Sequence, residues 1–319
     1  MRWLLLAWLA CHGQMLAAES ASQWLHDMST ALKTLDYDGI FVYQHDGKLD
    51  VMRIIHRVDD GGQRERLVSL TGSEREVLRD DRSVTCIMPD NRSVMIGRSG
   101  PTQPFPVVPD DLDAISRYYQ LEDLGQDRMI GYHARVIAVT PRDEFRYGYH
   151  FWIEQDSRML LKSDLTGVDG KAIEQVQFTT LDIGSDIPVS VLKPSLSGDG
   201  YTWHRQTEIN NAQGPGFGQP GWTVAELPAG FAMTDFRHRR LHEEGGDAEH
   251  MVFSDGMATV SVYVEQAVAG AGVFTGLSSM GAMNAYGAVV DGYQITVVGE
   301  VPPATVRMIA ESVRRQATS

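Results

Sequence analysis

The sequence predicts a mainly β, α+β protein: a first domain built on one large antiparallel sheet with two helices, and a smaller second α+β domain. Short segments in which apolar and polar side chains alternate recur at the spacing of an all-antiparallel sheet, and Gly, Pro, Asn and Asp turns separate them. Residues 193–221, rich in Gly, Pro, Ser, Asn and Gln, then divide the chain. On the order of ten strands precede this stretch, so we expect the sheet to curl into a barrel or half-barrel.

The clearest group of strands covers residues 142–184. A strand that begins near Tyr147 is followed by strands over Met159–Thr166 and Lys171–Leu181, with turn residues between them. Parallel strands need crossover connections of about a dozen residues or more, and these connections are too short. The three strands are therefore predicted to form an antiparallel meander.

Similar signals describe the rest of the first domain. Apolar residues at helical spacing predict a helix over Ser22–Leu35, with Ser20 or Ser22 as its N-cap. Strands are expected at Ile40–Tyr43, Leu49–Val58, Arg64–Leu70, Arg75–Arg79, Val84–Met88, Val94–Ile96, Leu121–Leu124 and Arg135–Val139.

Two segments interrupt this series of strands. Pro101–Pro109 contains four prolines, which lack ladder donors, so it is expected to form a loop. After it, Asp110 or Asp111 is expected to cap a helix that contains Leu112, Ile115, Tyr118 and Tyr119.

The second domain is also expected to consist of hairpin-linked strands with one helix. The strands are predicted at Trp222–Leu227, Phe231–Leu241, His250–Phe253, Ala258–Glu265 and Tyr293–Gly299. Gly270–Gly287 is crowded with glycine and is expected to be a mobile loop or a tight contact with a partner. Pro302 or Pro303 opens a closing helix, with Arg314 and Arg315 at its C-terminal end. Its apolar stripe consists of Val306, Ile309, Ala310 and Val313.

The N-terminal residues have the pattern of a secretory signal peptide. Arg2 precedes the apolar residues 4–10, and Ala17-Ala18 before Glu19 form a small-residue cleavage site. A lipoprotein signal with an acylated Cys11 is the alternative. The expected organisation is a signal peptide at 1–18, a half-barrel domain at 19–192, a linker at 193–221 and a smaller α+β domain at 222–319.

Composition limits the classes of function. Cleavage after Ala18 leaves Cys86 as the single cysteine, so an internal disulfide is excluded. The formal net charge is −14 at pH 7, and general nucleic-acid binding needs a cationic surface instead. We therefore expect no nucleic-acid partner.

Motifs for catalysis, metals or cofactors are lacking. The chain contains no HExxH, GxSxG, Walker loop or CxxC pattern. His238 and His242 have the spacing of a helical metal pair, but they fall on a predicted strand, where they are too far apart to chelate readily. Gly216–Gly221 matches a dinucleotide fingerprint, yet no strand precedes it and no helix follows. We therefore predict no catalytic residues, no metal and no cofactor.

The densest basic run of this acidic chain is Arg237–His242. One interpretation is a solvated strand edge whose charges prevent aggregation. The other is a docking surface for an acidic peptide or a phosphate group, in which Arg237, Arg239 and Arg240 form bidentate hydrogen bonds.

A large curled sheet with only two helices tends to enclose a space that can hold an apolar ligand. Trp152 favours such a space, because it breaks the alternation in which Phe151 and Ile153 share one face and His150 and Glu154 share the other. Residue by residue, a place in the core is the alternative. The candidate lipid-pocket residues are Phe41, Tyr43, Met52, Ile54, Phe151, Trp152, Leu160 and Phe178.

Several motifs occur in order across both predicted domains. They are Tyr118-Tyr119, Gly131-Tyr132 with Arg135, Arg142-Asp143 with Arg146-Tyr147, Trp152, Asp164-Leu165, Gly170, Glu174-Gln175, Glu226-Leu227-Pro228 with Gly230-Phe231, Ser254-Asp255-Gly256, Asn284-Ala285-Tyr286-Gly287 and Gly299-Glu300-Val301-Pro302-Pro303. With these motifs the chain resembles the MucB/RseB family of periplasmic regulators over nearly its whole length after the signal peptide.

This resemblance implies an unclosed β-barrel with helices at its mouth, as in lipoprotein carriers of the LolA, LolB and LppX type. It also implies a negative regulator of the envelope-stress response in the periplasm. Such a protein binds the periplasmic segment of a membrane-spanning anti-sigma factor, MucA or RseA, and protects it from regulated proteolysis. Lipid or lipopolysaccharide fragments weaken that complex. The family provides no catalytic residues.

The partner-binding candidates are Arg237, Arg239, Arg240 and Tyr286. We expect the partner peptide where the two domains meet, with the linker at 193–221 permitting reorientation. A periplasmic lipid or lipoprotein carrier is the alternative function, but a carrier has no need of a basic strand in a second domain. A secreted hydrolase is disfavoured by the missing motifs. The sequence leaves open a homo-oligomer, and whether lipid acts by competition or by domain reorientation.

Overall fold

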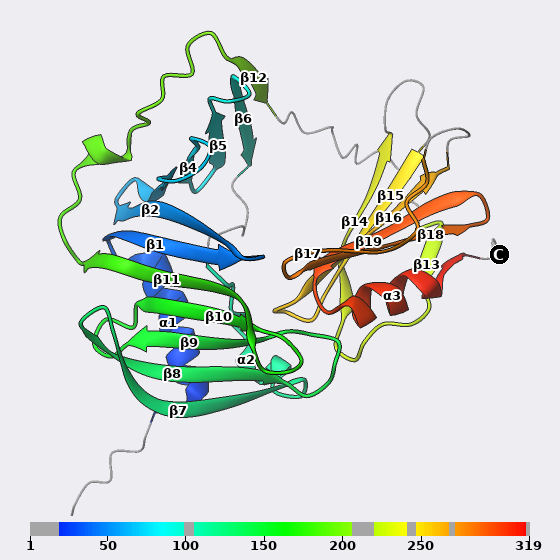
Figure 1. The fold of residues 1–319 in the computed structure, drawn as a ribbon, viewed down its shortest axis with the longest axis horizontal. Helices are drawn as coiled ribbons and strands as arrows, with labels where there is room; N and C mark the ends of the chain where they lie inside the picture. Colours follow the sequence, from blue (N-terminus) through cyan, green and yellow to red (C-terminus); the bar gives the residue numbers. More distant parts are fainter. Residues whose placement is uncertain (1–18, 99–104, 206–219, 241–246, 268–271, 317–319) are drawn as a thin grey trace, which may run out of the picture.

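The protein has two domains that lie side by side, each built on its own sheet (Figure 1). The structure is a computed structural model that describes residues 19–98, 105–205, 220–240, 247–267 and 272–316. The predicted signal peptide, residues 1–18, lies outside these ranges. Within them, every helix is too short or too polar to span a bilayer.

The first domain is a twelve-stranded sheet whose edge strands do not pair with each other, so the barrel is unclosed. Its strands are β1 (Tyr37–His45), β2 (Lys48–Asp59), β3 (Gly62–Ser69), β4 (Glu76–Asp80), β5 (Ser83–Met88), β6 (Ser93–Arg98), β7 (Tyr119–Met129), β8 (Tyr132–Pro141), β9 (Gly148–Glu154), β10 (Leu160–Thr166), β11 (Ala172–Ile183) and β12 (Thr202–Arg205). Their order is β12-β6-β5-β4-β3-β2-β1-β11-β10-β9-β8-β7. The predicted antiparallel meander is present as β9, β10 and β11, and the predicted fold class is confirmed.

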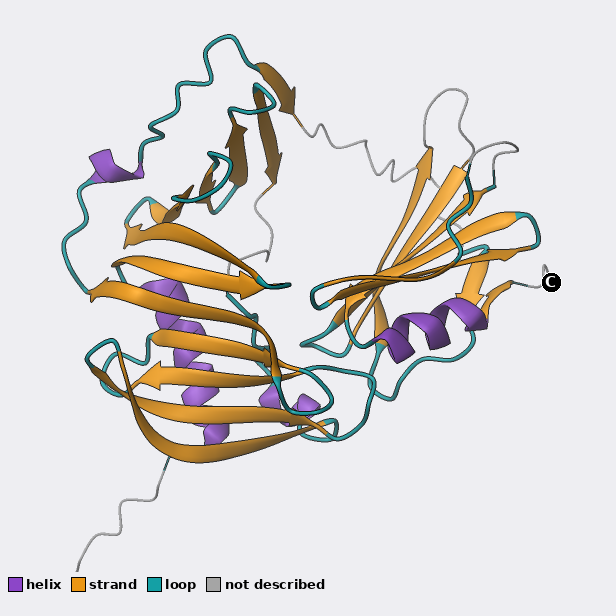
Figure 2. Ribbon diagram, viewed as in Figure 1, coloured by secondary structure: helices purple, strands orange, loops and turns teal. Residues whose placement is uncertain are grey.

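Helix α1 (Ala21–Thr34) forms where the sequence predicts an N-cap and an apolar stripe. The Ser20 hydroxyl accepts a hydrogen bond of 3.1 Å from the backbone N–H of Gln23. The helix packs on one face of the sheet, against β2, β7, β8 and β10 (Figure 2). Its buried side chains are Trp24, Leu25, Met28, Ala31 and Leu32. Burial of each large apolar side chain contributes roughly 1.5–3 kcal/mol, so this helix closes much of the first core.

The second helix of the first domain is shorter than predicted. Helix α2 spans only Leu112–Ile115, and its N-cap Asp111 accepts a hydrogen bond from the Ala114 N–H at 3.0 Å. Tyr119 begins β7 instead of continuing the helix, and its buried hydroxyl donates to Asp255 of the second domain at 2.9 Å. A contact between domains outweighs the local helical pattern at this point.

Part of the predicted linker, residues 193–221, belongs to the first domain. A one-turn 3₁₀ helix, η1 (Val189–Leu192), precedes it. The Glu76 carboxylate then accepts a 2.9 Å hydrogen bond from the Ser195 N–H, and β12 adds to the sheet beside β6 as the one parallel neighbour in its described strands. The first domain therefore extends to Arg205, and residues 206–219 lie outside the described part of the chain.

The second domain is a six-stranded antiparallel sheet with helix α3 (Pro303–Ser312) packed on it. Its strands are β14 (Ala232–Arg240), β15 (Asp247–Ser254), β16 (Thr259–Gln266), β17 (Gly276–Met280), β18 (Met283–Val290) and β19 (Tyr293–Glu300), in the order β14-β15-β16-β19-β18-β17. β13 (Trp222–Val224) and β20 (Val313–Arg315) form a separate pair. Of the predicted stripe, Val306, Ile309 and Ala310 lie on α3 and are fully buried, whereas Val313 is equally buried but begins β20.

Two predictions for the second domain are wrong. Much of the glycine-rich segment forms the β17–β18 hairpin rather than a loop. Gly287 is required there because a Cβ would lie 2.2 Å from the carbonyl oxygen of Phe274. Arg314 and Arg315 lie outside the helix, in β20, because the chain becomes extended there to pair with β13.

The two domains meet on a buried ion pair. The side chains of Arg146 and Asp255 are both fully buried, and Nη1 of Arg146 lies 2.7 Å from Oδ2 of Asp255. Arg146 also donates to Asp143 at 3.0 Å and to the carbonyl of Ala229 at 2.6 Å. A buried charge costs several kcal/mol unless it is paired and hydrogen-bonded, so this network specifies one arrangement of the domains.

Aromatic rings surround the guanidinium group of Arg146. Its central carbon lies 5.1 Å from the ring centroid of Tyr118, 5.4 Å from that of Tyr119 and 5.3 Å from that of Phe231. Gly230 allows Tyr118 to approach, because a Cβ at this position would lie 2.4 Å from the ring. The charge is thus enclosed by π-faces as well as by hydrogen-bond acceptors.

Two more hydrogen bonds join the domains. Thr305, in the first turn of α3, donates from its hydroxyl to the carbonyl of Phe145 at 2.6 Å. Asn284 donates across the interface to the hydroxyl of Tyr147 at 3.0 Å, and within its own domain to the carbonyl of Val301 at 2.8 Å. The interface is therefore held by directional bonds along its length.

The substitution Gly230→Ala should destabilise the protein by roughly 1–3 kcal/mol beyond the backbone cost, because the new Cβ overpacks against Tyr118. Gly131→Ala is the matched control: Gly131 has φ +95°, close to the +92° of Gly230, but no atom lies within 4 Å of its added Cβ. Urea unfolding measures both variants. Equal losses of unfolding free energy would contradict a role for the Tyr118 contact.

Candidate binding site between the two domains

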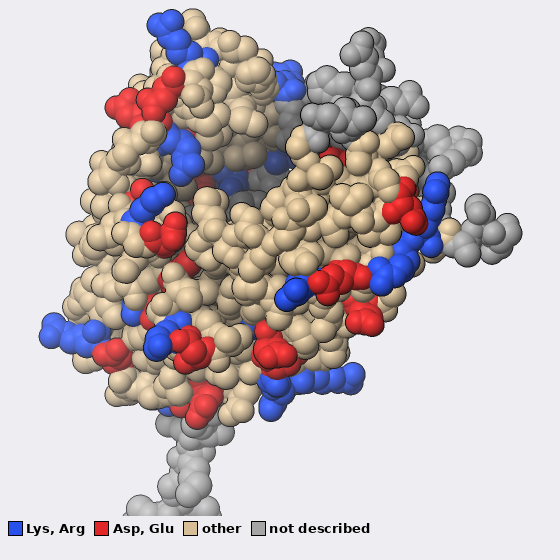
Figure 3. Space-filling model, turned by 45° about the vertical axis from the view of Figure 1, so that its right-hand side comes forward, with Lys and Arg blue, Asp and Glu red and all other residues tan. Residues whose placement is uncertain are grey.

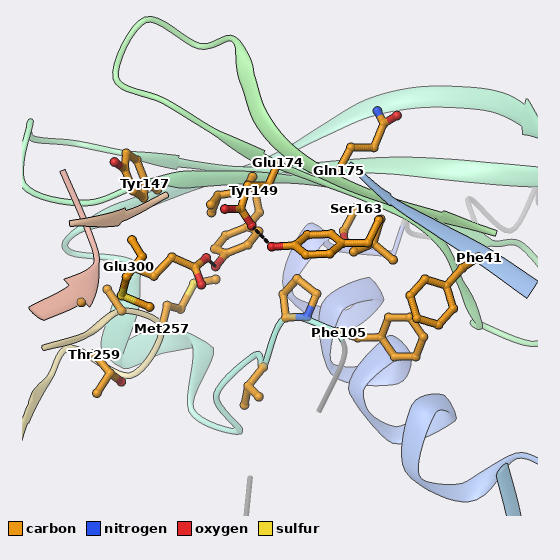
Figure 4. A pocket seen from close by; sticks show the side chains of 18 of the residues that line it. Phe41, Phe105, Tyr147, Tyr149, Ser163, Glu174, Gln175, Met257, Thr259 and Glu300 are labelled. Carbon is orange, nitrogen blue, oxygen red and sulfur yellow. Dashed lines mark hydrogen bonds between the residues drawn. The ribbon is translucent and has the colours of Figure 1, made fainter. Parts of the chain in front are cut away.

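A cavity of about 870 Å³ lies between the two domains. The strands β1, β2, β9, β10 and β11 of the first domain line it, together with residues 105–107 and, from the second domain, residues 256–259 and 298–300. Side chains from both domains point into this space (Figure 4). The surface is visibly hollowed between the domains, with mostly uncharged groups around the opening (Figure 3). Its volume is typical of sites for small molecules.

One end of the cavity is apolar. The ring centroids of Phe41 and Phe105 are 5.6 Å apart, and each ring also packs on Phe178, at 5.8 and 5.5 Å. Met52 contributes a thioether side chain to the cavity lining, and Met257 contributes another farther along, beside Glu300 (Figure 4). These groups offer no strong hydrogen bonds, so this end suits an acyl chain or another apolar group.

The other end carries tyrosine hydroxyls and two glutamates (Figure 4). The Tyr43 hydroxyl donates to Oε2 of Glu174 at 2.5 Å, and the Tyr149 hydroxyl donates to Oε1 of Glu300 at 3.4 Å. Glu300 keeps contact with solvent in the cavity, but surrounding protein removes much of its hydration. This desolvation, with the charge of Glu174, raises the pKa of Glu300 to about 7, and the hydrogen bond from Tyr149 opposes the shift.

The structure brings Phe41, Tyr43 and Met52 of the predicted lipid-pocket residues to the cavity. Four others are core residues with at most 1% exposure: Ile54, Phe151, Leu160 and Phe178. They belong to the cluster that also contains the buried side chains of α1, so the helix occupies the space that the sequence analysis assigned to a ligand.

Trp152, a predicted lipid-pocket residue, lies outside the lining of this cavity. Its Nε1 donates to Asp127 at 2.8 Å, and the Nζ of Lys162 lies 4.0 Å from its ring centroid. Trp152 therefore shares a face with polar neighbours and is absent from the cavity lining, whereas the adjacent Phe151 is fully buried. The alternation of the strand is preserved, and the cation explains the aromatic ring on the polar face.

The predicted partner-binding residues do not form one site. Arg237 is exposed on β14, an edge strand of the second sheet. The side chains of Arg239 and Arg240 lie outside the described residues, although their backbones are in β14. Tyr286 lies on β18, separated from β14 by three strands, and its hydroxyl donates to Glu311 at 3.1 Å.

Sequence reasoning missed the residues that join the domains at the cavity. Asp255 lies in the turn between β15 and β16, and its Oδ1 accepts hydrogen bonds from the N–H groups of Met257 and Ala258 at 2.9 and 2.7 Å. Its other oxygen pairs with Arg146, which lies 109 residues away in the chain. A local pattern contains no signal for a contact at that separation, and the same holds for Glu300.

Models of two domain families match the chain. The MucB/RseB N-terminal domain matches residues 20–196, and the MucB/RseB C-terminal domain matches residues 217–314. The two matches therefore cover both domains of the structure.

Known proteins with the same family name are similar to the chain over nearly its whole length. It is 31% identical over 307 residues to the sigma factor AlgU regulatory protein MucB of Pseudomonas aeruginosa, covering 95% of this chain and 93% of that protein. It is 28% identical over 302 residues to the sigma-E factor regulatory protein RseB of Haemophilus influenzae, with coverages of 92% and 91%.

Solved structures give the same result. The crystal structure of MucB in complex with MucA(peri) has a TM-score of 0.72 and 29% identity, covering 93% of this chain and 100% of that one. The Pseudomonas aeruginosa MucA/MucB complex has a TM-score of 0.73 and 30% identity, with coverages of 93% and 99%. The crystal structure of MucB has a TM-score of 0.62 and 28% identity, with coverages of 93% and 98%. On these matches in sequence and structure, the chain belongs to the MucB/RseB family.

Proposed function

We propose that this protein is a periplasmic regulator that binds the periplasmic segment of a membrane-spanning anti-sigma factor of the MucA/RseA kind. Through that segment it controls a sigma factor of the AlgU/sigma-E kind, and it protects the segment from regulated proteolysis. The similarity to MucB in its complex with MucA(peri), over 93% of this chain, carries the proposal. The similarity extends over both domains, so the chain is comparable with a complete regulator of this family and not only with one of its domains.

The cavity is the proposed site for a lipid or lipopolysaccharide fragment. Its volume of about 870 Å³ suits a small ligand, and the Phe41 and Phe105 rings favour an acyl chain. The hydroxyls of Tyr43 and Tyr149 lie at the other end, where a polar group of the ligand would be placed. Burial of apolar surface, at about 25 cal/mol per Å², supplies most of the binding energy in this proposal.

Lipid and anti-sigma segment are coupled, in this proposal, through the arrangement of the domains. Both domains line the cavity, so a ligand that fills it acts on the interface. The chain has TM-scores of 0.72 and 0.73 to the two structures that contain MucA and 0.62 to MucB, which supports more than one domain arrangement in the family. Two ligands that prefer different arrangements must lower each other's affinity by the same factor.

A periplasmic lipid or lipoprotein carrier is the second candidate function. The unclosed barrel and its cavity favour it. Affinity capture from solubilised bacterial membranes distinguishes the two functions. The regulator should retain a single-span anti-sigma factor, and its periplasmic segment, titrated alone, should bind more weakly when lipid is added. Capture of mixed lipoproteins without an anti-sigma factor would instead support the carrier.

The substitution Met257→Glu should weaken binding of a dansylated fatty acid about tenfold or more, because it replaces an apolar lining side chain with a second carboxylate beside Glu300 (Figure 4). Met233→Glu is the matched control, since Met233 belongs to the same domain, is 49% exposed and does not line the cavity. Fluorescence titration measures both variants. Equal affinities would show that the fatty acid binds elsewhere.

The basic strand remains a proposed docking surface for an acidic partner. Affinity for the anti-sigma segment should then fall as salt shortens the screening length from about 30 Å at 0.01 M to about 8 Å at 0.15 M. The variant R237A/R239A/R240A should lose affinity and most of this dependence, while R237K/R239K/R240K should keep the dependence because it keeps the charges. Anisotropy titrations of each variant at two salt concentrations measure the affinity and its dependence on salt. Unchanged affinity in the alanine variant would contradict a docking role and would favour the interpretation of this strand as a solvated edge.

A further inference from the structure

The tip of the β17–β18 hairpin docks on a carboxylate of the first domain. Ala282, at the tip, is fully buried, and its N–H donates to Oε1 of Glu174 at 2.9 Å. Gly281 beside it has φ +58°, and a Cβ there would lie 2.8 Å from the same oxygen. The Tyr43 hydroxyl holds the other oxygen of Glu174 at 2.5 Å. Glu174 is therefore the acceptor that fixes the hairpin to the first domain.

A second carboxylate, from the other domain, faces this anchor. Glu300 ends β19 and pairs in register with Met283, at the start of β18. Its side chain lines the same cavity as Glu174, and its charge interacts with that of Glu174. The Tyr149 hydroxyl is the hydrogen-bond donor that the described structure gives to Glu300. Two acidic groups from different domains thus line one cavity, and the hydrogen-bond donors that the described residues give them are two tyrosine hydroxyls and one backbone N–H.

The other ionisable groups around the cavity have partners of their own or lie apart. Tyr43 stacks on His45, which is 3.0 Å from Asp50. The exposed Arg75 is the one basic residue among the described residues that line the cavity. Tyr147 accepts a hydrogen bond from Asn284. Elsewhere in the interface, Tyr119 donates a hydrogen bond to Asp255, whose charge is paired with that of Arg146.

We propose that Glu300 is a proton-operated switch of domain docking: its protonation favours the docked β17–β18 hairpin, and its ionisation weakens that docking. The cause is the repulsion between two carboxylates that come from different domains and meet in a partly dehydrated cavity. This inference concerns the protein without ligands, so it does not rest on the proposed function.

The direction follows from the protons bound in each state. In the docked protein the pKa of Glu300 is raised from the ordinary value of 4.5 to about 7, first through desolvation and then through the charge of Glu174. Between these values the docked state holds the additional proton, so docking weakens as the pH rises through this window and is constant above it. One proton changes the docking equilibrium by at most tenfold per pH unit, and the solvent that reaches Glu300 reduces this limit.

Hydrogen exchange of the Ala282 amide, followed by NMR between pH 5 and pH 8, tests the switch. This amide exchanges when the hairpin leaves Glu174, so its protection factor, corrected for the intrinsic rate, reports docking. It should fall several-fold, and at most tenfold per unit, between about pH 5 and pH 7, then level off. The substitution Glu300→Gln should make the protection factor high and independent of pH. Glu122→Gln, at an exposed position of β7, is the control that should behave as the unaltered protein.

Three results would overturn the proposal. The first is a protection factor of the unaltered protein that does not change with pH. The second is a pH dependence that persists in E300Q, which would assign the titration to another group such as His45. The third is an equal effect of E122Q and E300Q, which would reflect net charge rather than the contact with Glu174. The carbon resonance of the Glu300 carboxylate gives an independent check, because its titration midpoint should lie well above the ordinary value for a glutamate.

Discussion

The buried pair of Arg146 and Asp255 is the interaction on which the rest of the structure depends. Each side chain is fully buried, so loss of either one would remove a charged partner from a group that has no access to water. The pair also recruits Tyr119, Asp143 and the Ala229 carbonyl, so separating the domains breaks several bonds together.

The cavity exists because the two domains are in contact. The first domain supplies its aromatic end, and the second supplies Met257, Thr259 and Glu300, so neither domain forms the whole site alone. The ion pair lies at one end of the interface, and the hairpin held by Glu174 is a separate anchor. The two anchors differ in chemistry. The Arg146 pair joins opposite charges, whereas Glu174 and Glu300 bring like charges together, so this second anchor is the weaker and the more adjustable.

Part of the connection between the domains is fixed on the first domain. In the segment before β12, Arg66 donates to the Val191 carbonyl at 2.9 Å and Glu76 accepts from the Ser195 N–H. Among the described residues, the contacts that join the two domains are therefore those across the interface, which ligands or protons can alter.

The sequence by itself determined most of the strands, helices α1 and α3, the division into two domains and the family. These features depend on alternation, caps and turn residues, which act within a few positions of one another; Ser20 capping α1 and the buried stripe from Val306 to Val313 are examples. Only the tertiary structure decided that Tyr119 starts a strand, that Trp152 faces away from the cavity, and that Glu300 meets Glu174. Each of these outcomes depends on neighbours that come from other strands or from the other domain, such as Asp255 for Tyr119 at a separation of 136 residues. The local pattern is the same whether or not such neighbours are present.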